Sequence, residues 1–340
     1  MARQPRKRPS TMSDIAREAG VSQTTVSFVL NNHSSSANIP AETKDRILET
    51  AKKLSYRPNL AAKALRTNQT HTIGFITDRI ATTPHAVKII KGAQDAAWAN
   101  GKLLLIVNTG SDATVTETAI EMLLERQVEG IIYAAMYHQE VALPANIYEG
   151  SSVLVDCFCA DRSLPSVVPN EIQGGRTATE MLLKKGHRRI GFINNVNPIP
   201  ASFGRLEGYK QALRAYGVPF DEDLVRLHAS ESRGGYRGTL ELLQLREPPT
   251  AIFCFSDFMA VGAYDALRTL GLSIPDDVAV MGFDNYELIT TKLSFPLSTI
   301  ELPHYQMGKW AIQFLLEHSG ESLPPVQHTL DCPYIERQSV

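Results

Sequence analysis

The chain has 340 residues, more than a single hydrophobic core usually supports, so two or three domains are expected. Its composition, 43% hydrophobic and 21% charged with a net charge of −2, is typical of a globular protein and excludes a disordered or fibrous one. No stretch approaches the roughly 18 uninterrupted apolar residues of a membrane helix, and the basic N-terminus lacks the apolar run of a signal peptide. We therefore expect a cytoplasmic location and no membrane partner.

The small net charge hides an uneven distribution along the chain. Residues 1–70 carry twelve lysines and arginines against five acids, a net +7, which leaves 22 basic and 31 acidic residues, or −9, for residues 71–340. A basic segment followed by a large acidic one predicts that a polyanion binds the first segment only. A solvated basic tail would explain residues 3–8, but not the basic residues spread through the patterned segment behind them.

That segment begins with a pattern for two short helices joined by a tight turn. Ser13 is a plausible N-cap for a helix over 14–19, Gly20 ends this helix, and Ser22 caps a second helix over 23–30. In a basic segment this pattern is typical of a helix-turn-helix, whose second helix presents its N-terminal side chains to the DNA major groove. The candidates for contact with bases are Gln23, Thr24, Thr25, Ser27 and Phe28. An ordinary helical hairpin is the alternative.

Two further helical segments follow. A helix is expected over 41–54, just after Pro40, with Ile47, Leu48, Ala51 and Leu54 facing inward. Residues 60–66 have the length of about two helical turns, which is too short for a stable isolated helix, so this segment needs a partner to fold against.

Beyond Thr70, short apolar runs alternate with helical patterns, which predicts parallel sheets covered by helices. The runs are residues 72–76, 103–108, 130–133, 153–157, 190–194, 251–255 and 278–283. The motif of residues 73–76 (Ile-Gly-Phe-Ile) recurs at 190–193, and each copy precedes a helix framed by glycines nine residues apart, 92–101 and 208–217. The repeat predicts two similar lobes that enclose a ligand cleft beyond the carboxyl ends of the strands.

Two charged residues are placed to face such a cleft. Asp284 follows an apolar strand that would bury it, and a ligand hydroxyl or amine could supply the donors that its carboxylate needs. Arg205 stands at the start of a helical pattern and offers a planar fork of donors. A structural ion pair within the lobe is the alternative for each.

Several motifs occur in the order and spacing of one family. The segments are Ser13-Asp14-Ile15-Ala16, Ala19-Gly20-Val21-Ser22, Thr25-Val26-Ser27 and Tyr56-x-Pro58-Asn59-x-Ala61-Ala62-x-x-Leu65. Together they resemble the LacI/GalR (lactose/galactose repressor) family of bacterial transcription regulators, and the similarity runs to the C-terminal Ile335–Val340. The resemblance implies a DNA-binding headpiece, a hinge helix that folds when two subunits meet on a palindromic operator, and a periplasmic-binding-protein-like core.

The resemblance also implies the domain organisation. The chain is expected to consist of a helix-turn-helix headpiece (1–58), a hinge helix and linker (59–70), and an effector-binding and dimerisation core (71–340). Within the core, one subdomain takes about 71–168 and 301–330, and the other about 170–299 and 332–340, with crossovers near Pro169, 297–300 and 331–333. The expected fold class is α/β: an all-α headpiece followed by two lobes of parallel sheet.

The same resemblance assigns roles to particular residues. Leu65 matches a leucine that wedges into the minor groove, where an apolar side chain unstacks a base step. Asn31, Tyr56 and Asn59 match positions that contact the DNA backbone or pack the hinge. Ser13 and Arg66 complete the expected DNA-binding set. Phe28 replaces a polar or basic residue, so the operator sequence cannot be copied from relatives.

In the core, the resemblance implies a set of effector-binding residues. These are His85, Asp156, Phe158, Asn170, Gln173, Arg205, Ser256 and Asp284. Ser230 stands where family members place an aromatic stacking residue, and His85 and Ala86 replace the aromatic pair expected for a purine. A purine effector is therefore disfavoured, and a sugar or sugar derivative remains the default.

The expected function is that of a homodimeric, ligand-responsive DNA-binding regulator, most often a repressor of carbohydrate-use genes. The sequence lacks dinucleotide, phosphate-loop, nucleophile-elbow and metal-spaced histidine motifs, so we expect no catalysis, no metal and no cofactor. The four cysteines are expected to be reduced thiols. Two alternatives remain: a regulator whose corepressor is a phosphoprotein, and a sugar-binding transport or sensory protein.

Overall fold

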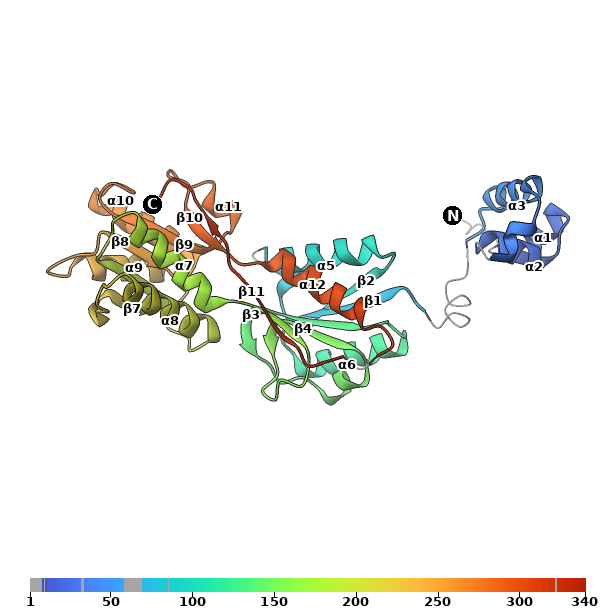
Figure 1. Ribbon diagram of the computed structural model, residues 1–340, viewed down its shortest axis with the longest axis horizontal. Helices are drawn as coiled ribbons and strands as arrows, with labels where there is room; N and C mark the ends of the chain where they lie inside the picture. The colour runs from blue at the N-terminus through green and yellow to red at the C-terminus, as the bar shows by residue number, and fades with distance from the viewer. Residues whose placement is uncertain (1–7, 9, 32–33, 58–68, 85, 322) are drawn as a thin grey trace, which may run out of the picture. The chain divides into compact units, whose positions relative to one another are not determined.

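The computed structural model describes residues 8, 10–31, 34–57, 69–84, 86–321 and 323–340, and separates into two compact units (Figure 1). Residues 1–70 form the first unit and residues 71–340 the second. No helix among the described residues is both long and apolar enough to cross a membrane.

The first unit is a small all-helical domain. It contains α1 (Met12–Ala19), α2 (Gln23–Leu30), the 3-10 turn η1 (Ser34–Asn38) and α3 (Ala41–Lys53). Ile15, Val26, Val29 and Ile47 are buried where the three α-helices meet. The N-cap of α2 is Ser22, whose hydroxyl accepts a bond from the Thr25 amide, as the sequence predicts.

Two details of this unit differ from the sequence-based expectation. The N-cap of α1 is Thr11 rather than Ser13, because Thr11 and Asp14 bond reciprocally in a capping box and Ser13 lies in the first turn, exposed. Leu48 is half-exposed rather than inward, because the buried stripe of α3 is centred on Ile47 and Thr50. The predicted helix over 60–66 lies outside the described residues.

The second unit is built on two six-stranded sheets. Sheet A has the order β11-β5-β4-β3-β1-β2 and is entirely parallel. Its strands are β1 (Thr72–Thr77), β2 (Leu103–Asn108), β3 (Ile131–Glu140), β4 (Ser152–Phe158), β5 (Ser166–Pro169) and β11 (Gln327–Leu330). α5 (Val87–Ala99) and α12 (His304–Glu317) pack on one face, and α6 (Ala113–Glu125) and η3 (Ala145–Glu149) pack on the other. Both faces are therefore apolar, which explains the continuous hydrophobic runs.

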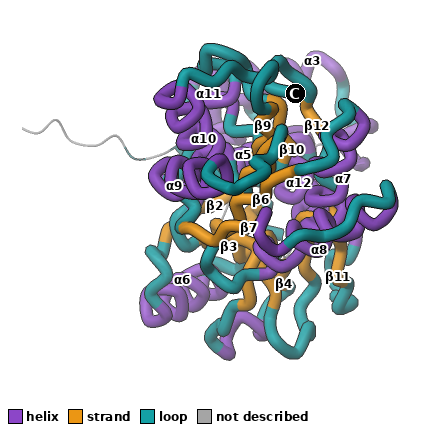
Figure 2. The backbone as a smooth tube through the Cα atoms, turned by 90° about the vertical axis from the view of Figure 1, so that its left-hand side faces the viewer, coloured by secondary structure: helices purple, strands orange, loops and turns teal. Residues whose placement is uncertain are grey.

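Sheet B repeats this plan with the order β12-β10-β9-β8-β6-β7. Its strands are β6 (Ile190–Asn195), β7 (Val225–His228), β8 (Ala251–Cys254), β9 (Ala279–Asp284), β10 (Ser298–Glu301) and β12 (Tyr334–Ile335), of which only β12 pairs antiparallel. The surrounding helices are α7 (Glu171–Lys184), α8 (Pro200–Ala215), α9 (Ser232–Leu243), α10 (Asp257–Leu270) and the short α11 (Glu287–Thr290). The 3-10 turn η4 (Glu222–Leu224) lies beside sheet B, and η2 (Ile80–Thr82) lies beside sheet A. Figure 2 shows the strands running between layers of helix.

The chain passes between the sheets three times. It leaves sheet A after β5 to form α7 against α8, returns after β10 to form α12 against α5, and crosses again between β11 and β12. Each lobe is thus completed by segments far apart in the sequence, and a hydrogen bond from Asn170 to Asp331 joins the first and third connections.

The repeated Ile-Gly-Phe-Ile motif has the same role in both lobes. In β1, the space beside Gly74 is filled by Leu123 of α6, and in β6 the space beside Gly191 is filled by Leu242 of α9. The prediction that the glycines 92 and 208 open a helix is wrong, because α5 begins at Val87 and α8 at Pro200. Both glycines lie where two helices cross closely: a Cβ on Gly92 would be 1.9 Å from the Tyr305 carbonyl oxygen of α12.

Candidate functional site

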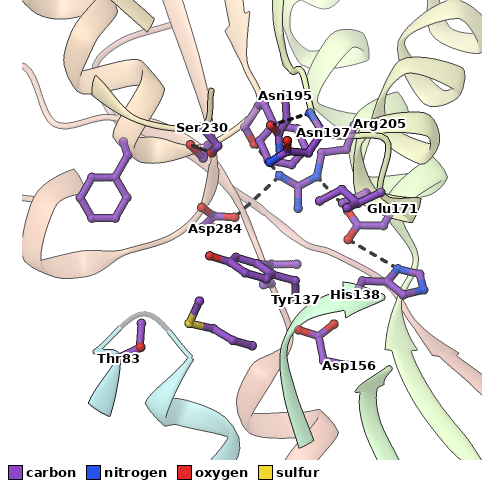
Figure 3. Close-up of a pocket in the computed structure, with 17 residues that line it drawn as sticks. Thr83, Tyr137, His138, Asp156, Glu171, Asn195, Asn197, Arg205, Ser230 and Asp284 are labelled. Atoms are coloured by element: carbon purple, nitrogen blue, oxygen red, sulfur yellow. Dashed lines mark hydrogen bonds and ion pairs between the residues drawn. The ribbon is translucent and has the colours of Figure 1, made fainter. Parts of the chain in front are cut away.

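A cavity of about 360 Å³ lies between the two lobes, at the carboxyl ends of strands from both sheets (Figure 3). This volume falls in the range of small-molecule sites, and the position is the one that parallel α/β sheets use for ligands. The described residues that line it are Thr83, Met136, Tyr137, His138, Asp156, Glu171, Asn195, Asn197, Ile199, Ala201, Arg205, Ser230, Phe255, Ser256, Phe258, Asp284 and Leu302.

Arg205 of α8 is the positive charge at the centre of the sheet B wall (Figure 3). It is 97% buried; its Nε donates to Glu171 Oε2 at 2.8 Å, and a terminal nitrogen donates to the Phe255 carbonyl oxygen. The guanidinium carbon lies 3.5 Å from the centroid of the Phe283 ring. Arg205 is therefore fixed in one orientation, with Asp284 Oδ1 3.8 Å from a terminal nitrogen.

Glu171 is the main partner of Arg205 and lies at the first position of α7. Burial alone would raise the pKa of Glu171, but the Arg205 guanidinium and the His138 imidazole outweigh burial and lower this pKa. His138 Nδ1 lies 3.8 Å from Glu171 Oε1, too far for a hydrogen bond. Glu171 is therefore ionised at neutral pH.

Asp284 ends β9 with a strained backbone and a raised pKa. Its φ of 116° falls in a region that residues with a Cβ rarely adopt. Burial raises the pKa of the Asp284 carboxyl to about 7, although the Arg205 guanidinium acts in the opposite direction. The carboxyl is thus held at the cavity wall with its pKa raised toward neutral pH.

Asp156 faces this group from the other lobe. It lies near the end of β4 with a φ of 57°, and it is 98% buried. Burial raises the pKa of its carboxyl well above the ordinary value, and the nearby charge of Glu171 adds to this effect. Asp156 Oδ1 has no hydrogen-bond partner in the described part of the chain, so this buried acceptor at the cavity wall is left unsatisfied.

Ser256 is also brought to the cavity, while Asp257 beside it is not. Ser256 caps α10, and its hydroxyl lies 2.8 Å from that of Ser230, so the two hydroxyl groups form a pair in the wall. Asp257 points into the lobe, where its oxygens accept bonds from the Tyr286 amide and the Thr299 hydroxyl, each at 2.7 Å. Asp257 is therefore a structural residue.

The structure does not bring every predicted effector-binding residue to the cavity. Phe158 packs edge-on against His138 and beneath the Arg162 guanidinium. Asn170 caps α7 and donates to Asp331, and Gln173 bonds both backbone groups of Cys332. Asn170 and Gln173 therefore tie the first crossover to the third. His85 lies outside the described residues.

Sequence reasoning missed several lining residues. Asn195 is the last residue of β6 and Asn197 follows it, the same signal that identified Asp284, so they could have been found. Glu171 and His138 gave no such signal, because the first opens a helix after a crossover and the second lies in a strand predicted to end at residue 133. Tyr137 and Phe258, both partly exposed, supply aromatic faces at positions the sequence did not indicate.

The headpiece offers a second candidate site, on α2. Gln23 and Thr24 in its first turn are exposed, while Ser27 and Phe28 are partly buried. The Thr25 hydroxyl lies 2.8 Å from that of Ser22, so Thr25 completes the helix start. The N-terminal end of α2 thus presents two free polar side chains at the place where a recognition helix meets base edges.

The other predicted DNA-binding residues have mixed environments. Asn31 caps the end of α2, and its side-chain amide donates to the Ser27 carbonyl oxygen at 2.8 Å. Tyr56 packs against the headpiece core, and burial raises its pKa. Ser13 is exposed on α1. Asn59, Leu65 and Arg66 lie outside the described residues.

Together, a basic helix-turn-helix unit and a two-lobed core with a ligand-sized cavity define the class of ligand-responsive DNA-binding transcription regulators. The profile of "bacterial regulatory proteins, lacI family" matches residues 11–59, and that of "periplasmic binding proteins and sugar binding domain of LacI family" matches residues 70–338. The chain belongs to the LacI family of bacterial regulators.

Individual proteins agree with this assignment. The transcriptional regulator RegA of Clostridium saccharobutylicum is 32% identical over 335 residues, covering 97% of this chain and 99% of RegA. The Lac repressor dimer bound to operator and the anti-inducer ONPF is similar with a TM-score of 0.79 at 26% identity, covering 98% and 99% of the two chains. The regulator CelR in complex with cellobiose gives 0.67 at 26% identity, covering 97% and 100%.

Proposed function

We propose that this regulator is a dimeric cytoplasmic repressor of carbohydrate-use genes, which binds a palindromic operator and responds to a sugar or sugar derivative held between its lobes. The observation that carries the effector assignment is the cavity, which combines polar groups from both lobes with the aromatic faces of Tyr137 and Phe258. Hydroxyl-rich ligands with an apolar ring face suit such a wall. The sugar-binding profile and the cellobiose complex of CelR support the same ligand class.

The cavity also supplies a mechanism for the response. Asp156 is contributed by sheet A, and Arg205 and Asp284 by the sheet B lobe, so a ligand bonded to all three favours one spacing of the lobes. An effector changes operator affinity only by its difference in affinity for the two states. Because the ligand is bound by groups on both lobes, its affinity depends on the spacing of the lobes, which the three crossovers connect. No catalytic step and no cofactor enter this mechanism.

The proposed DNA contacts follow the headpiece geometry. Gln23 and Thr24 are proposed to read base edges, with Thr25, Ser27 and Phe28 beside them, and Ser13, Asn31, Tyr56 and Asn59 to contact or support the backbone. Leu65 is proposed as the minor-groove wedge, with Arg66 beside it. Leu65→Ala is then expected to weaken specific binding far more than non-specific binding. An equal loss in both would show that the wedge role is wrong.

A surface for dimerisation lies along the outer edge of sheet A. β2 is the edge strand, and Leu103 and Ile106 on it are 52% and 43% exposed. Val115 and Met122 of the adjacent α6 are similarly exposed, and all but Leu103 line one apolar depression. Contiguous exposed apolar surface of this kind marks an interface, and we propose that a second copy of the chain covers it.

The regulator reading is tested by operator selection from genomic fragments, followed by titration at several salt concentrations. A headpiece that neutralises several phosphates is expected to lose about a thousandfold or more in affinity between about 50 and 200 mM salt. The two alternatives separate in the same experiment. A transport or sensory protein shows no salt-dependent binding to any fragment, and a regulator with a phosphoprotein corepressor binds DNA but gains nothing from any small ligand.

A further inference from the structure

Acidic side chains outnumber basic ones among the described residues that line the cavity. Among the described lining residues, Asp156, Glu171 and Asp284 are acids, Arg205 has the one guanidinium, and His138 has an imidazole. Asp156 is contributed by the sheet A lobe, and Asp284 and Arg205 by the sheet B lobe (Figure 3). A neutral ligand would leave at least one of these carboxyl groups either protonated or without a counter-charge.

Arg205 does not compensate all three acids. Its Nε donates to Glu171, one terminal nitrogen donates to the Phe255 carbonyl oxygen, and Asp284 lies beyond hydrogen-bond distance at 3.8 Å. The rings of Phe283 and Phe255 stack against the guanidinium plane, so it cannot turn toward the sheet A lobe without losing these contacts. The Arg205 charge is therefore balanced by Glu171, and a ligand can bond to Arg205 only through its second terminal nitrogen, which makes no hydrogen bond within the described part of the chain.

Asp156 is left as an acceptor directed at the cavity. Its Oδ1 has no partner among the described residues, and its Oδ2 lies 3.9 Å from His304 Nε2, which is too far for a hydrogen bond. A buried carboxylate without donors is costly, so burial raises the pKa of Asp156 and keeps its carboxyl protonated in the empty site. A ligand that brings a charged donor to this oxygen removes that cost.

We propose that the effector carries a protonated amine, as an amino sugar or a similar amine-bearing polyol does, and that the ammonium group binds at Asp156 between the lobes. This inference rests on the proposed function and specifies its ligand. The remaining hydroxyl groups face the pair formed by Ser230 and Ser256. Sugar phosphates and nucleotides are disfavoured, because a phosphate would lie among three carboxyl groups while the Arg205 charge is already balanced by Glu171.

The carboxyl groups also fix how binding depends on pH. In the empty site, burial and the charges of Glu171, Asp78 and Asp284 raise the pKa of Asp156, and Arg205 opposes them. A bound ammonium group lowers the pKa of Asp156 and of Asp284, because it favours the ionised carboxylates. Protons therefore leave the site when the ligand binds, and affinity rises with pH for as long as the amine stays protonated.

Two imidazoles face the same groups: His138 on β3 approaches Glu171, and His304 on α12 approaches Asp156.

The test uses the full-length protein and matched sets of small ligands. Each set contains one amino hexose (glucosamine, galactosamine or mannosamine), its parent hexose, its N-acetyl derivative and its 6-phosphate. Affinity is measured by calorimetry at pH 6, where the amines are protonated, for the wild type and Asp156→Asn. Glu121→Gln, which removes an exposed acid of α6, is the matched control.

The expected result is that at least one amino hexose binds ten times or more tightly than its parent hexose and its N-acetyl derivative. Asp156→Asn is expected to reduce this preference to threefold or less, and Glu121→Gln to leave it unchanged. Calorimetry of the wild type in buffers of different ionisation enthalpy supplies a second readout that needs no variant. It is expected to show proton release on binding of the amino hexose.

Other outcomes overturn the inference. Equal or tighter binding of the neutral hexoses, tightest binding of the phosphates, no binding of any amino hexose, or proton uptake on binding would each contradict an ammonium group at Asp156. None of these outcomes affects the proposed function, which fails instead when the protein shows no salt-dependent operator binding. A neutral hexose that changes operator affinity would retain the proposed function and remove the amine.

Discussion

At the scale of single residues, the cavity depends on carboxyl groups whose surroundings differ. Glu171 and Asp284 both lie near Arg205, yet the pKa of Glu171 is lowered and that of Asp284 is raised to about 7. The difference follows from geometry, because Arg205 donates a 2.8 Å hydrogen bond to Glu171 and lies 3.8 Å from Asp284. As pH rises, ionisation of Glu171 therefore increases the free energy of unfolding, and ionisation of Asp284 decreases it.

Asp284→Asn tests this environment through the pH dependence of stability. The pKa of Asp284 is about 7 in the folded chain against 3.8 for an ordinary carboxyl, so its contribution to stability is complete below about pH 4 and is lost as pH rises to 7. The wild type is expected to lose up to about 4 kcal/mol relative to Asp284→Asn over this range. Urea unfolding of both proteins between pH 4 and 8 measures the difference.

The control for this comparison is Asp223→Asn, which changes an exposed acid of η4 and is expected to follow the wild type. Parallel stability curves for the wild type and Asp284→Asn would contradict the assigned environment.

The capping box of α1 gives a second residue-scale prediction. Thr11→Ala removes the hydroxyl that accepts the Asp14 amide, and is expected to destabilise the headpiece by about 1 kcal/mol. Ser13→Ala changes an exposed first-turn residue and is expected to cost much less. Hydrogen exchange of residues 10–20 in the full-length protein measures both effects. Equal protection losses in the two variants would contradict the assignment of Thr11 as the cap.

At the scale of elements, the sequence predicted the long buried strands and missed the short ones. β1, β2, β4, β6, β8 and β9 agree with the apolar runs to within about two residues, because strands covered on both faces are continuously hydrophobic. β5, β7, β10 and β11 have four residues each with polar residues among them, and β12 has two residues, so none forms a continuous apolar run like the four residues of β8. The crossovers adjoin these short strands. Sequence reasoning therefore identified cavity residues at the ends of predicted strands, such as Asp284, and missed Glu171, which comes after β5.

Glycines 92 and 208 were wrongly predicted as helix starts, because the sequence alone does not show which element packs against them. Sequence shows where a glycine stands but not what approaches it, and only the fold brings α12 against α5. Gly92 faces the Tyr305 carbonyl in this contact, and Gly308 of α12 faces the Ile89 carbonyl at 2.0 Å from an added Cβ. The two glycines let the helices cross at close range.

Gly92→Ala tests this crossing. The added methyl group would lie 1.9 Å from a backbone oxygen, so the helices must separate, and we expect a loss of about 3 kcal/mol or more of stability. Gly271→Ala is the matched control: it sits at a helix end with a φ of 71° and open space, and only the backbone strain of about 1 kcal/mol is expected. Thermal unfolding of the full-length proteins compares them. A Gly271→Ala loss as large as that of Gly92→Ala would contradict the close crossing.

At the scale of the whole molecule, the split between a +7 headpiece segment and a −9 core divides the work between DNA binding and ligand sensing. A two-fold operator requires two headpieces at a fixed spacing, so the proposed dimerisation through the core belongs to the same proposed function.

Ile106→Glu tests the dimer surface. A buried acid at the edge of β2 is expected to shift the protein toward monomer and to weaken operator binding at least tenfold, because an unpaired charge in an apolar interface costs several kcal/mol. Tyr148→Glu changes an exposed residue that lines a pocket with Glu321 and Leu323, and is expected to change neither property. Sedimentation velocity and operator titration measure both. A dimeric Ile106→Glu protein would contradict the proposed surface.

The central claim is that a ligand between the lobes changes the affinity of the headpieces for DNA. The measurement that tests it most directly is the dissociation constant for the selected operator, with and without the tightest-binding ligand of the calorimetric panel, in the wild type and in Asp284→Ala. We predict a change of about 5- to 150-fold in the wild type, and no change in Asp284→Ala, whose ligand-free operator affinity equals that of the wild type. An operator affinity that the bound ligand leaves unchanged in the wild type, or a full response in Asp284→Ala, would contradict the account.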